Sequence, residues 1–323
     1  MNLTSPSQVK AWCIEHEFHP NKVLGQNFLI DQNALKAIVD AGLKMIESSN
    51  NRIIESEVNA SAHSAIRPAD HSIIQSFDYS IIPHVLEIGP GLGVLTEEML
   101  NRGCRVTAIE KDPVLAERLA ASLGNPPNLT VIADDALAWL ARQRKKGDRD
   151  ARDGRDGKSS LLPSSFFPLP FSHMISNLPY QAGTRILLEL VQKRAIPSLT
   201  VLVQTEVAER LAAPEGSKTR GLAGVWAQLD YDVKIVRKVS ASCFWPRPEI
   251  GSSVVRLDRH DRNGGLSDER RRVFYRLTKR AFEHRRKQLG SVFKNVIQST
   301  NRAEDLSNAD WVALAQSLSP TDV

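Results

Sequence analysis

The stretch Glu87-Ile88-Gly89-Pro90-Gly91-Leu92-Gly93 decides the fold of this chain. It follows an apolar run over residues 85–88 and precedes a segment with helical periodicity, so it predicts a strand, a tight turn and a helix. Glycines in such a turn let the backbone approach a ligand and adopt dihedral angles that a side chain would forbid. The stretch therefore predicts a site for a nucleotide-like cofactor at Gly89 and Gly91.

Outward from this turn, apolar runs alternate with helical patterns. That rhythm predicts a doubly wound α/β domain with a parallel sheet. The expected strands cover residues 105–109, 129–132, 174–176 and 200–203, and the helices follow from Pro113, near Ala136 and near Arg185.

Two acids follow expected strands, where ligands bind in open α/β sheets. Glu110 lies about twenty residues beyond the turn and can accept hydrogen bonds from both hydroxyls of a ribose. Both a dinucleotide and S-adenosylmethionine would use it, but the Glu-x-Gly-x-Gly-x-Gly spacing favours S-adenosylmethionine. Asp135 can accept from an adenine amine of the cofactor, or it can simply cap the helix that begins at Ala136. Its position at a strand end favours the cofactor role.

The tetrapeptide Asn177-Leu178-Pro179-Tyr180 follows a later strand of the same expected sheet. An aromatic amine is a poor nucleophile until acceptors draw its hydrogens aside, and the Asn177 side-chain oxygen and Leu178 carbonyl can be those acceptors. Pro179 restricts the backbone, and Tyr180 offers a ring on which a base can stack. A chance Pro-containing turn is the structural alternative. Together the two motifs predict methyl transfer to an exocyclic amine, with alignment as the main source of catalysis.

Two further segments suggest contact with RNA. Phe244-Trp245-Pro246-Arg247-Pro248 is a rigid aromatic loop in which Phe244 either forms a second wall for the base or packs beneath the sheet. Residues 270–294 carry ten Lys and Arg against one acid, Glu283, with apolar residues at helical spacing. They predict one helix with an apolar face and a basic face, the latter either contacting phosphates or simply solvated.

Composition narrows the class of protein. The 323 residues carry a formal charge of +5, which suits a polyanionic partner without requiring one. Three cysteines that are far apart indicate neither a disulfide framework nor a zinc site, and the eight histidines show no metal-ligand pattern. No secretory signal or membrane-spanning run is apparent. The sequence therefore predicts a cytoplasmic protein without a metal or a membrane partner.

The chain divides into two expected domains. Residues 1–262 form the methyltransferase domain, with an N-terminal helical arm and insertions near 47–80 and 142–171. The second insertion begins with a mixed-charge stretch over 142–158 that is typical of a solvated loop, with phosphate contact as the alternative. Residues 263–323 form a helical RNA-binding domain.

Eight segments carry a family resemblance. They are Leu24-Gly-Gln-Asn-Phe-Leu29, Glu87-Ile-Gly-Pro-Gly-Leu-Gly93, Ile109-Glu110, Asp135-Ala136, Asn177-Leu-Pro-Tyr180, Gln204-Thr-Glu-Val207, Phe244-Trp-Pro-Arg-Pro248 and Ala281-Phe-Glu-His-Arg-Arg-Lys287. In combination they resemble the ribosomal RNA adenine dimethyltransferase family of small-subunit enzymes. The resemblance implies a Rossmann-like, S-adenosylmethionine-dependent methyltransferase domain followed by a small all-α domain. It also implies a monomer that dimethylates N6 of two adjacent adenines in the 3′-terminal hairpin of small-subunit rRNA, within a pre-ribosomal particle.

The resemblance further implies roles for single residues. Asn27 and Leu29 close over the cofactor, and Asn177 lies between the cofactor and the target amine. The other expected cofactor contacts are Gly89, Gly91, Glu110 and Asp135. The expected substrate contacts are Tyr180, Phe244, Arg285, Arg286 and Lys287. The chain departs from the family pattern after Tyr180, at Gln181, and at Gly251, where an Asp is usual.

Three alternatives remain open from the sequence. An erythromycin-resistance type of enzyme has a similar fold but modifies large-subunit rRNA. A ribosome-assembly factor would bind immature small subunits with methylation secondary, although the intact tetrapeptide argues against a purely structural role. A nicotinamide-dependent oxidoreductase would need hydride-transfer residues, and none is recognisable.

Overall fold

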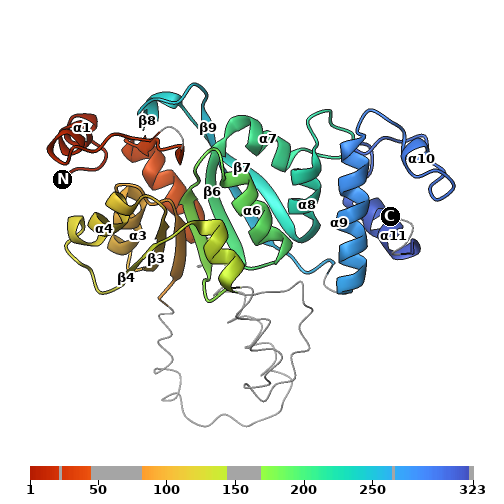
Figure 1. Cartoon of the computed structure of the whole chain (residues 1–323), viewed down its shortest axis with the longest axis horizontal. Helices are drawn as coiled ribbons and strands as arrows, with labels where there is room; N and C mark the ends of the chain where they lie inside the picture. Colours follow the sequence, from red (N-terminus) through yellow and green to blue (C-terminus); the bar gives the residue numbers. More distant parts are fainter. Residues whose placement is uncertain (22–23, 45–81, 144–168, 264–265, 320–323) are drawn as a thin grey trace, which may run out of the picture.

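The computed structural model describes residues 1–21, 24–44, 82–143, 169–263 and 266–319 (Figure 1). The insertion expected near 47–80 lies outside these residues, as does all of the one near 142–171 except its first two and last three residues. The described residues form a seven-stranded sheet, a two-stranded sheet and the helices that pack on them.

The central sheet has the strand order β4-β3-β2-β5-β6-β9-β7. Its strands are β2 (His84–Ile88), β3 (Arg105–Glu110), β4 (Leu129–Ala133), β5 (His173–Asn177), β6 (Ser198–Gln204), β7 (Tyr231–Val239) and β9 (Ser252–Arg259). β2 to β6 pair in parallel, as the alternating pattern predicted. The order reverses beside β2, which places the crevice at the carboxyl ends of β2 and β5.

β9 was not predicted from the sequence. It runs antiparallel to both of its neighbours, β6 and β7. The sheet is therefore mixed, whereas the rhythm of the sequence predicted a parallel one. Residues 240–251, which join β7 to β9, contain no α-helix that could cross over the sheet. A parallel pair requires such a crossover, so the chain returns beside β7 in the opposite direction.

Helices cover both faces of the central sheet. One apolar cluster includes Leu86 of β2 and Leu187 of α6, and the other includes Val85 of β2 and Leu95 of α3. Successive strand residues point to opposite faces, so one strand supplies both cores. The helices with printed bounds are α3 (Val94–Asn101), α4 (Pro113–Ser122), α6 (Gly183–Gln192), α7 (Thr205–Ala212) and α8 (Leu222–Asp230), and residues 32–44 and 136–143 are also helical.

The N-terminal arm is tied to the aromatic loop. It consists of α1 (Pro6–Glu15), a short strand β1 (Phe28–Leu29) and the helix over 32–44. β1 pairs antiparallel with β8 (Phe244–Trp245), so two segments far apart in the sequence lie side by side. The Asp31 carboxylate caps the following helix, accepting from the Ala34 amide at 2.7 Å.

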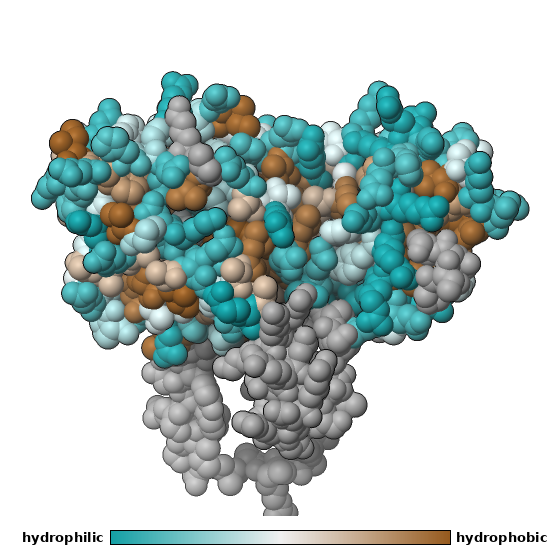
Figure 2. Space-filling view, in the orientation of Figure 1, coloured by the Kyte–Doolittle hydropathy of each residue, from teal (hydrophilic) through white to brown (hydrophobic). Residues whose placement is uncertain are grey.

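The C-terminal helices are α9 (Asp268–Glu283), α10 (Leu289–Val292) and α11 (Asn308–Ser317). They share an apolar cluster with Val225 and Leu229 of α8, which joins them to the rest of the molecule. The surface over α9 is largely hydrophilic (Figure 2). Its exposed basic side chains are Arg272, Arg276, Lys279 and Arg280.

The prediction of one helix through residues 270–294 is wrong. The helix ends at Glu283, and residues 284–287 form a turn. Beyond that turn, the Leu289 and Gly290 amides donate to the carbonyls of Asn301 and Ser299, which draws the chain away from the axis of α9. A Cβ atom at position 290 would lie 2.9 Å from the Ser299 carbonyl oxygen, so glycine permits this close approach.

Candidate cofactor and substrate site

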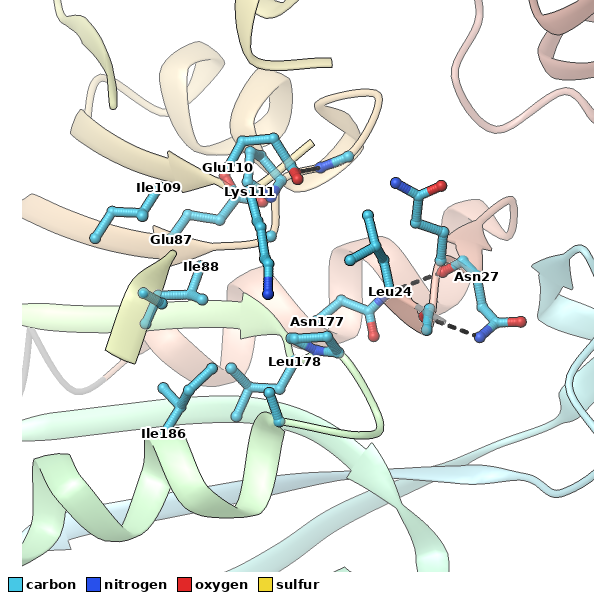
Figure 3. Close-up of a pocket in the computed structure, with 18 of the residues that line it drawn as sticks. Leu24, Asn27, Glu87, Ile88, Ile109, Glu110, Lys111, Asn177, Leu178 and Ile186 are labelled. Carbon is cyan, nitrogen blue, oxygen red and sulfur yellow. Dashed lines mark hydrogen bonds between the residues drawn. The ribbon is translucent and has the colours of Figure 1, made fainter. Parts of the chain in front are cut away.

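A cavity of about 190 Å³ opens at the carboxyl ends of β2, β3 and β5 (Figure 3). The crevice therefore lies where the strand-end argument placed it. The N-terminal arm, the glycine-rich turn, the ends of β3 and β4, the Asn177 tetrapeptide and the start of α6 all line it. Of the predicted residues, Asn27, Leu29, Gly89, Gly91, Glu110, Asp135, Asn177, Leu178, Pro179 and Tyr180 lie along it.

The glycine-rich turn needs its glycines. Gly89 and Gly91 have φ values of 69° and 59°, in the left-handed region where a side chain is strained. A Cβ atom at position 91 would also lie 3.0 Å from the Phe28 ring of the arm. These two positions therefore keep a bare backbone against the cavity.

Glu110 is held by backbone donors at the end of β3. Its Oε2 accepts from the Gly91 amide at 3.0 Å, and its Oε1 accepts from the Asp112 amide at 2.9 Å. Burial raises the pKa of the Glu110 carboxyl, while the bonds from these amides oppose the rise. Each carboxylate oxygen can accept a further hydrogen bond, so the group can still receive ribose hydroxyls.

Glu87 belongs to the glycine-rich motif, but no role was predicted for it. The side chain is 1% exposed, and the Thr96 hydroxyl donates to its Oε2 at 2.6 Å. Burial, reinforced by the nearby charge of Glu110, raises the pKa of Glu87 to about 8. Glu87 is therefore mainly protonated at neutral pH. An acid inside an otherwise apolar strand was the signal that could have identified it.

Asp135 caps a helix and also lies on the cavity, so its position is compatible with both roles that the sequence left open. Its Oδ1 accepts from the Ala138 amide at 3.0 Å, so it caps the following helix, and it also lines the cavity. Its Oδ2 lies 3.0 Å from the Nζ atom of Lys111, whose side chain extends into the cavity in Figure 3. The Ala138 amide and Lys111 lower the pKa of Asp135. Sequence reasoning missed Lys111, although it directly follows Glu110.

Asn177 offers an unused acceptor at the centre of the site. Its Nδ2 donates to the Asn27 carbonyl at 3.1 Å, which fixes the direction of the amide (Figure 3). Its Oδ1 is buried and has no hydrogen-bond partner within the described part of the chain. A buried acceptor is costly to leave unpaired, so this atom is suited to receive a donor from a bound ligand.

The N-terminal arm lies directly on the tetrapeptide. A Cβ atom at Gly25 would stand 3.2 Å from the Tyr180 amide nitrogen. The Pro179 carbonyl accepts from the Gly183 amide at 2.7 Å, which joins the tetrapeptide to the start of α6. The Asn27 side chain donates to the Gly25 carbonyl at 3.1 Å, so it orders the arm itself. These contacts bring together two of the segments that carry the resemblance, Leu24–Leu29 and Asn177–Tyr180.

Tyr180 is held by its hydroxyl. The residue is among those that line the cavity, and its hydroxyl lies 2.7 Å from the Ser252 hydroxyl of β9. Burial raises the pKa of the Tyr180 phenol. No sequence pattern had connected Ser252 with this site.

Phe244 does not line the cavity, which contradicts its predicted place as the second wall for a base. The side chain is 2% exposed and belongs to the apolar cluster beneath the sheet. The cause is the β1–β8 pair, which sets Phe244 opposite Leu29. The other interpretation of the loop, a packed turn, describes this structure, and Trp245 stacks on Phe28 with ring centroids 6.5 Å apart.

The predicted basic contacts lie in the turn after α9, outside the cavity. Arg286 and Lys287 are exposed. Arg285 instead donates to the Lys218 carbonyl and lies 3.5 Å from a Glu304 carboxylate oxygen, so it connects two loops.

Two of the basic residues in 270–294 make contacts within the protein. Arg271 is 1% exposed and makes a bidentate ion pair with Asp230 at 2.6 and 3.0 Å. Arg270 donates to the carbonyls of Ala315 and Leu318 in the C-terminal helix region. Neither belongs to a basic face, because both side chains form contacts between helices.

In the described ranges, no three His, Cys, Asp or Glu side chains are grouped so as to hold a metal ion. None of the helices described there has both the length and the apolar character needed to cross a membrane.

Comparison with known proteins gives a consistent family. Residues 71–319 match the model of the family described as ribosomal RNA adenine dimethylase. The ribosomal RNA small subunit methyltransferase A of Sphingopyxis alaskensis is 38% identical, over 72% of this chain and 83% of that protein. The protein of the same name from Alkaliphilus oremlandii is 31% identical, over 98% of both chains.

Solved structures support the fold. A dimethyladenosine transferase from Plasmodium falciparum has a TM-score of 0.55 at 20% identity, over 72% of this chain and 88% of that one. The 23S rRNA methyltransferase ErmE has a TM-score of 0.55 at 19% identity, over 90% of this chain and 98% of that one. At these identities, both show a shared Rossmann-like fold and no more.

The family match, the relatives and the fold are all consistent with a cavity that the glycine-rich turn and the tetrapeptide line together. The chain thus belongs to the ribosomal RNA adenine dimethylase family, as an rRNA adenine dimethyltransferase that uses S-adenosylmethionine as its cofactor.

Proposed function

We propose that this protein places two methyl groups on N6 of each of two adjacent adenines in the 3′-terminal hairpin of small-subunit rRNA. The observation that carries the proposal is the buried, unpartnered Oδ1 of Asn177, in a tetrapeptide that shares one cavity with the glycine-rich turn. The names of the relatives, ribosomal RNA small subunit methyltransferase A, support the choice of subunit.

The residues around the cavity fit S-adenosylmethionine. Gly89 and Gly91 present bare backbone, and Glu110 and Asp135 present acceptors for the ribose and the adenine amine. Asn27 and Leu29 of the arm would cover the bound molecule. When bound, the cofactor supplies an electrophilic methyl group on its sulfonium.

The chemistry assigned to the chain is the preparation of the amine. The Asn177 Oδ1 atom and the Leu178 carbonyl would accept hydrogen bonds from the N6 amine, which localises the nitrogen lone pair. The Asn27 carbonyl holds the Asn177 amide in the orientation that this role requires. A strong general base is unnecessary, because the nitrogen becomes acidic only after it accepts the methyl group. The catalytic assignment is Asn177, Leu178, Pro179 and Tyr180.

The C-terminal part would bind RNA. We divide the chain near residue 262, between β9 and α9, into a catalytic domain over 1–262 and a helical domain over 263–323. The exposed Arg286 and Lys287 support contact with phosphates, whereas Arg285 is already partnered and would act by holding its loop. The substrate proposed is rRNA in a pre-ribosomal particle, bound by a cytoplasmic monomer.

The test is to supply labelled S-adenosylmethionine with unmethylated small subunits and, separately, large subunits, and to analyse the nucleosides by mass spectrometry. We expect N6,N6-dimethyladenosine in the small-subunit rRNA alone. Label in large-subunit rRNA alone would establish the resistance-type alternative. Subunit binding without any transfer would favour the assembly role over the catalytic one.

A further inference from the structure

Ser252 stands directly behind the tyrosine of the catalytic tetrapeptide. Its side chain is fully buried, at 0% exposed, and its Oγ lies 2.7 Å from the Tyr180 hydroxyl. Ser252 does not line the cavity, so it can act on a ligand only through Tyr180. It belongs to β9, the antiparallel strand that the sequence rhythm did not anticipate.

Tyr180 needs such an anchor because its own backbone does not hold the ring. Residues 180–182 form a turn between β5 and α6. A tyrosine has two rotatable side-chain bonds, so backbone contacts alone do not determine the plane of its ring. A hydrogen bond at the far end of the ring restricts both rotations. The plane of the ring is then set before a base arrives, which reduces the ordering required at binding.

Ser252 is itself held on three sides. It pairs with Gln204 of β6 and Val239 of β7, at the end of the sheet where the cavity opens. The preceding Gly251 accepts from the Thr205 amide at 3.1 Å, and a Cβ atom at Gly251 would lie 3.2 Å from the Val239 carbonyl oxygen. The hydroxyl therefore has a fixed position relative to the strands that carry the site.

We propose that Ser252 is a positioning residue for the target base, acting by fixing the ring of Tyr180 against which an adenine stacks. This inference rests on the proposed function, since it requires an adenine as the methylated group. We expect the effect of Ser252 to fall mainly on kcat, because a small misplacement of the amine slows the chemical step more than it weakens binding.

The neighbouring residue provides a matched control. Ser253 is also fully buried, and its hydroxyl lies 3.1 Å from the Thr205 hydroxyl. Adjacent residues of a strand point to opposite faces, so Ser253 faces away from Tyr180. Ser252→Ala and Ser253→Ala thus remove the same atom from the same strand, but only the first removes the contact with Tyr180.

The experiment compares the wild-type protein with Ser252→Ala, Tyr180→Phe, the double variant and Ser253→Ala, on unmethylated small subunits. We expect Ser252→Ala to lower kcat about tenfold, the size associated with one hydrogen bond, and to raise the share of monomethylated product. The KM for S-adenosylmethionine should change less than twofold. The double variant should be no slower than Tyr180→Phe, because both changes remove one contact.

Three results would overturn the inference: equal kcat values for the two serine variants, independent losses that multiply in the double variant, or wild-type kcat in Tyr180→Phe. The last remains decisive if Ser252→Ala fails to fold, because Tyr180→Phe removes the same bond from the other side. Wild-type transfer to large subunits alone would refute the proposed substrate instead. The variants would then be compared on that RNA, which keeps the two questions separate.

Discussion

Asn177 uses the two ends of its amide differently. The nitrogen donates to the Asn27 carbonyl, and the oxygen is left without a partner in the described part of the structure. An amide that pointed the other way would face the carbonyl with its oxygen, which is repulsive. The arm therefore determines which atom Asn177 presents to a substrate.

Replacing Asn177 by alanine should lower the single-turnover rate of methyl transfer by about a hundredfold or more, the typical cost of removing one preorganised group at a reacting centre. Binding to small subunits should persist, since the proposed RNA contacts Arg286 and Lys287 lie outside the cavity and are unchanged. Asn128→Ala is the control: Asn128 donates to the Cys104 carbonyl at 2.7 Å and does not line the cavity. Normal methylation by the Asn177 variant would refute its assignment.

Glu87 should make stability depend on pH. Its pKa is raised to about 8 in the folded protein from an ordinary value of 4.5. Between these values the folded state retains a proton that the unfolded state releases, so the free energy of unfolding falls as pH rises. The contribution is at most about 1.4 kcal/mol per pH unit.

Glu87→Gln cannot ionise and should lack this contribution. Urea unfolding at several pH values from 5 to 8.5 should show the variant gaining stability relative to the wild type as pH rises, with the gain levelling off above pH 8. Glu117→Gln, on the exposed side of α4, is the matched control and should follow the wild type. Parallel curves for Glu87→Gln and the wild type would contradict the prediction.

At the scale of elements, α8 and α9 are joined by a buried ion pair. The Arg271 guanidinium makes two bonds to Asp230 and also donates to the carbonyls of Leu266 and Asn263. Since all these groups are withdrawn from water, removing one partner leaves the others unsatisfied. The contact orients the C-terminal helices on the catalytic part.

Arg271→Ala should lower the free energy of unfolding by about 3–5 kcal/mol, because it removes both hydrogen bonds to the buried Asp230 carboxylate and leaves only Arg194, at 3.8 Å, beside its charge. Arg272→Ala, one residue along on the exposed side of α9, should change it by less than about 0.5 kcal/mol. Denaturant titration of both variants measures the difference. Similar values for the two would show that the buried pair does not hold the helices together.

At the scale of the whole molecule, the turn that carries Arg286 and Lys287 lies outside the cavity. Arg286→Ala/Lys287→Ala should weaken binding to unmethylated small subunits and reduce the slope of log K against log salt by about 1.5, if each residue contacts one phosphate. The control Lys10→Ala/Arg118→Ala removes two exposed charges from α1 and α4, at the opposite end of the molecule from α9 (Figure 1). Equal slopes for the wild type and the Arg286/Lys287 variant would exclude the turn from the RNA contact.

The sequence by itself determined the sheet core and the cofactor turn. These depend on local patterns: strands of apolar residues, glycines at positive φ, and acids at strand ends, all of which are encoded within a few neighbouring residues. The direction of β9, the end of α9 at Glu283 and the burial of Phe244 were decided by pairing with distant segments.

Tertiary structure alone placed the contacts that hold the site and the C-terminal helices. The Asn27 carbonyl, Ser252 and the Asp230–Arg271 pair join residues separated by 41 to 150 positions. No local periodicity encodes such contacts, because they depend on which strands become neighbours in the folded sheet. The sequence thus predicted which groups are candidates for the chemistry, and the tertiary structure decided how each one is held, since a sequence shows residue types but not the direction in which they point.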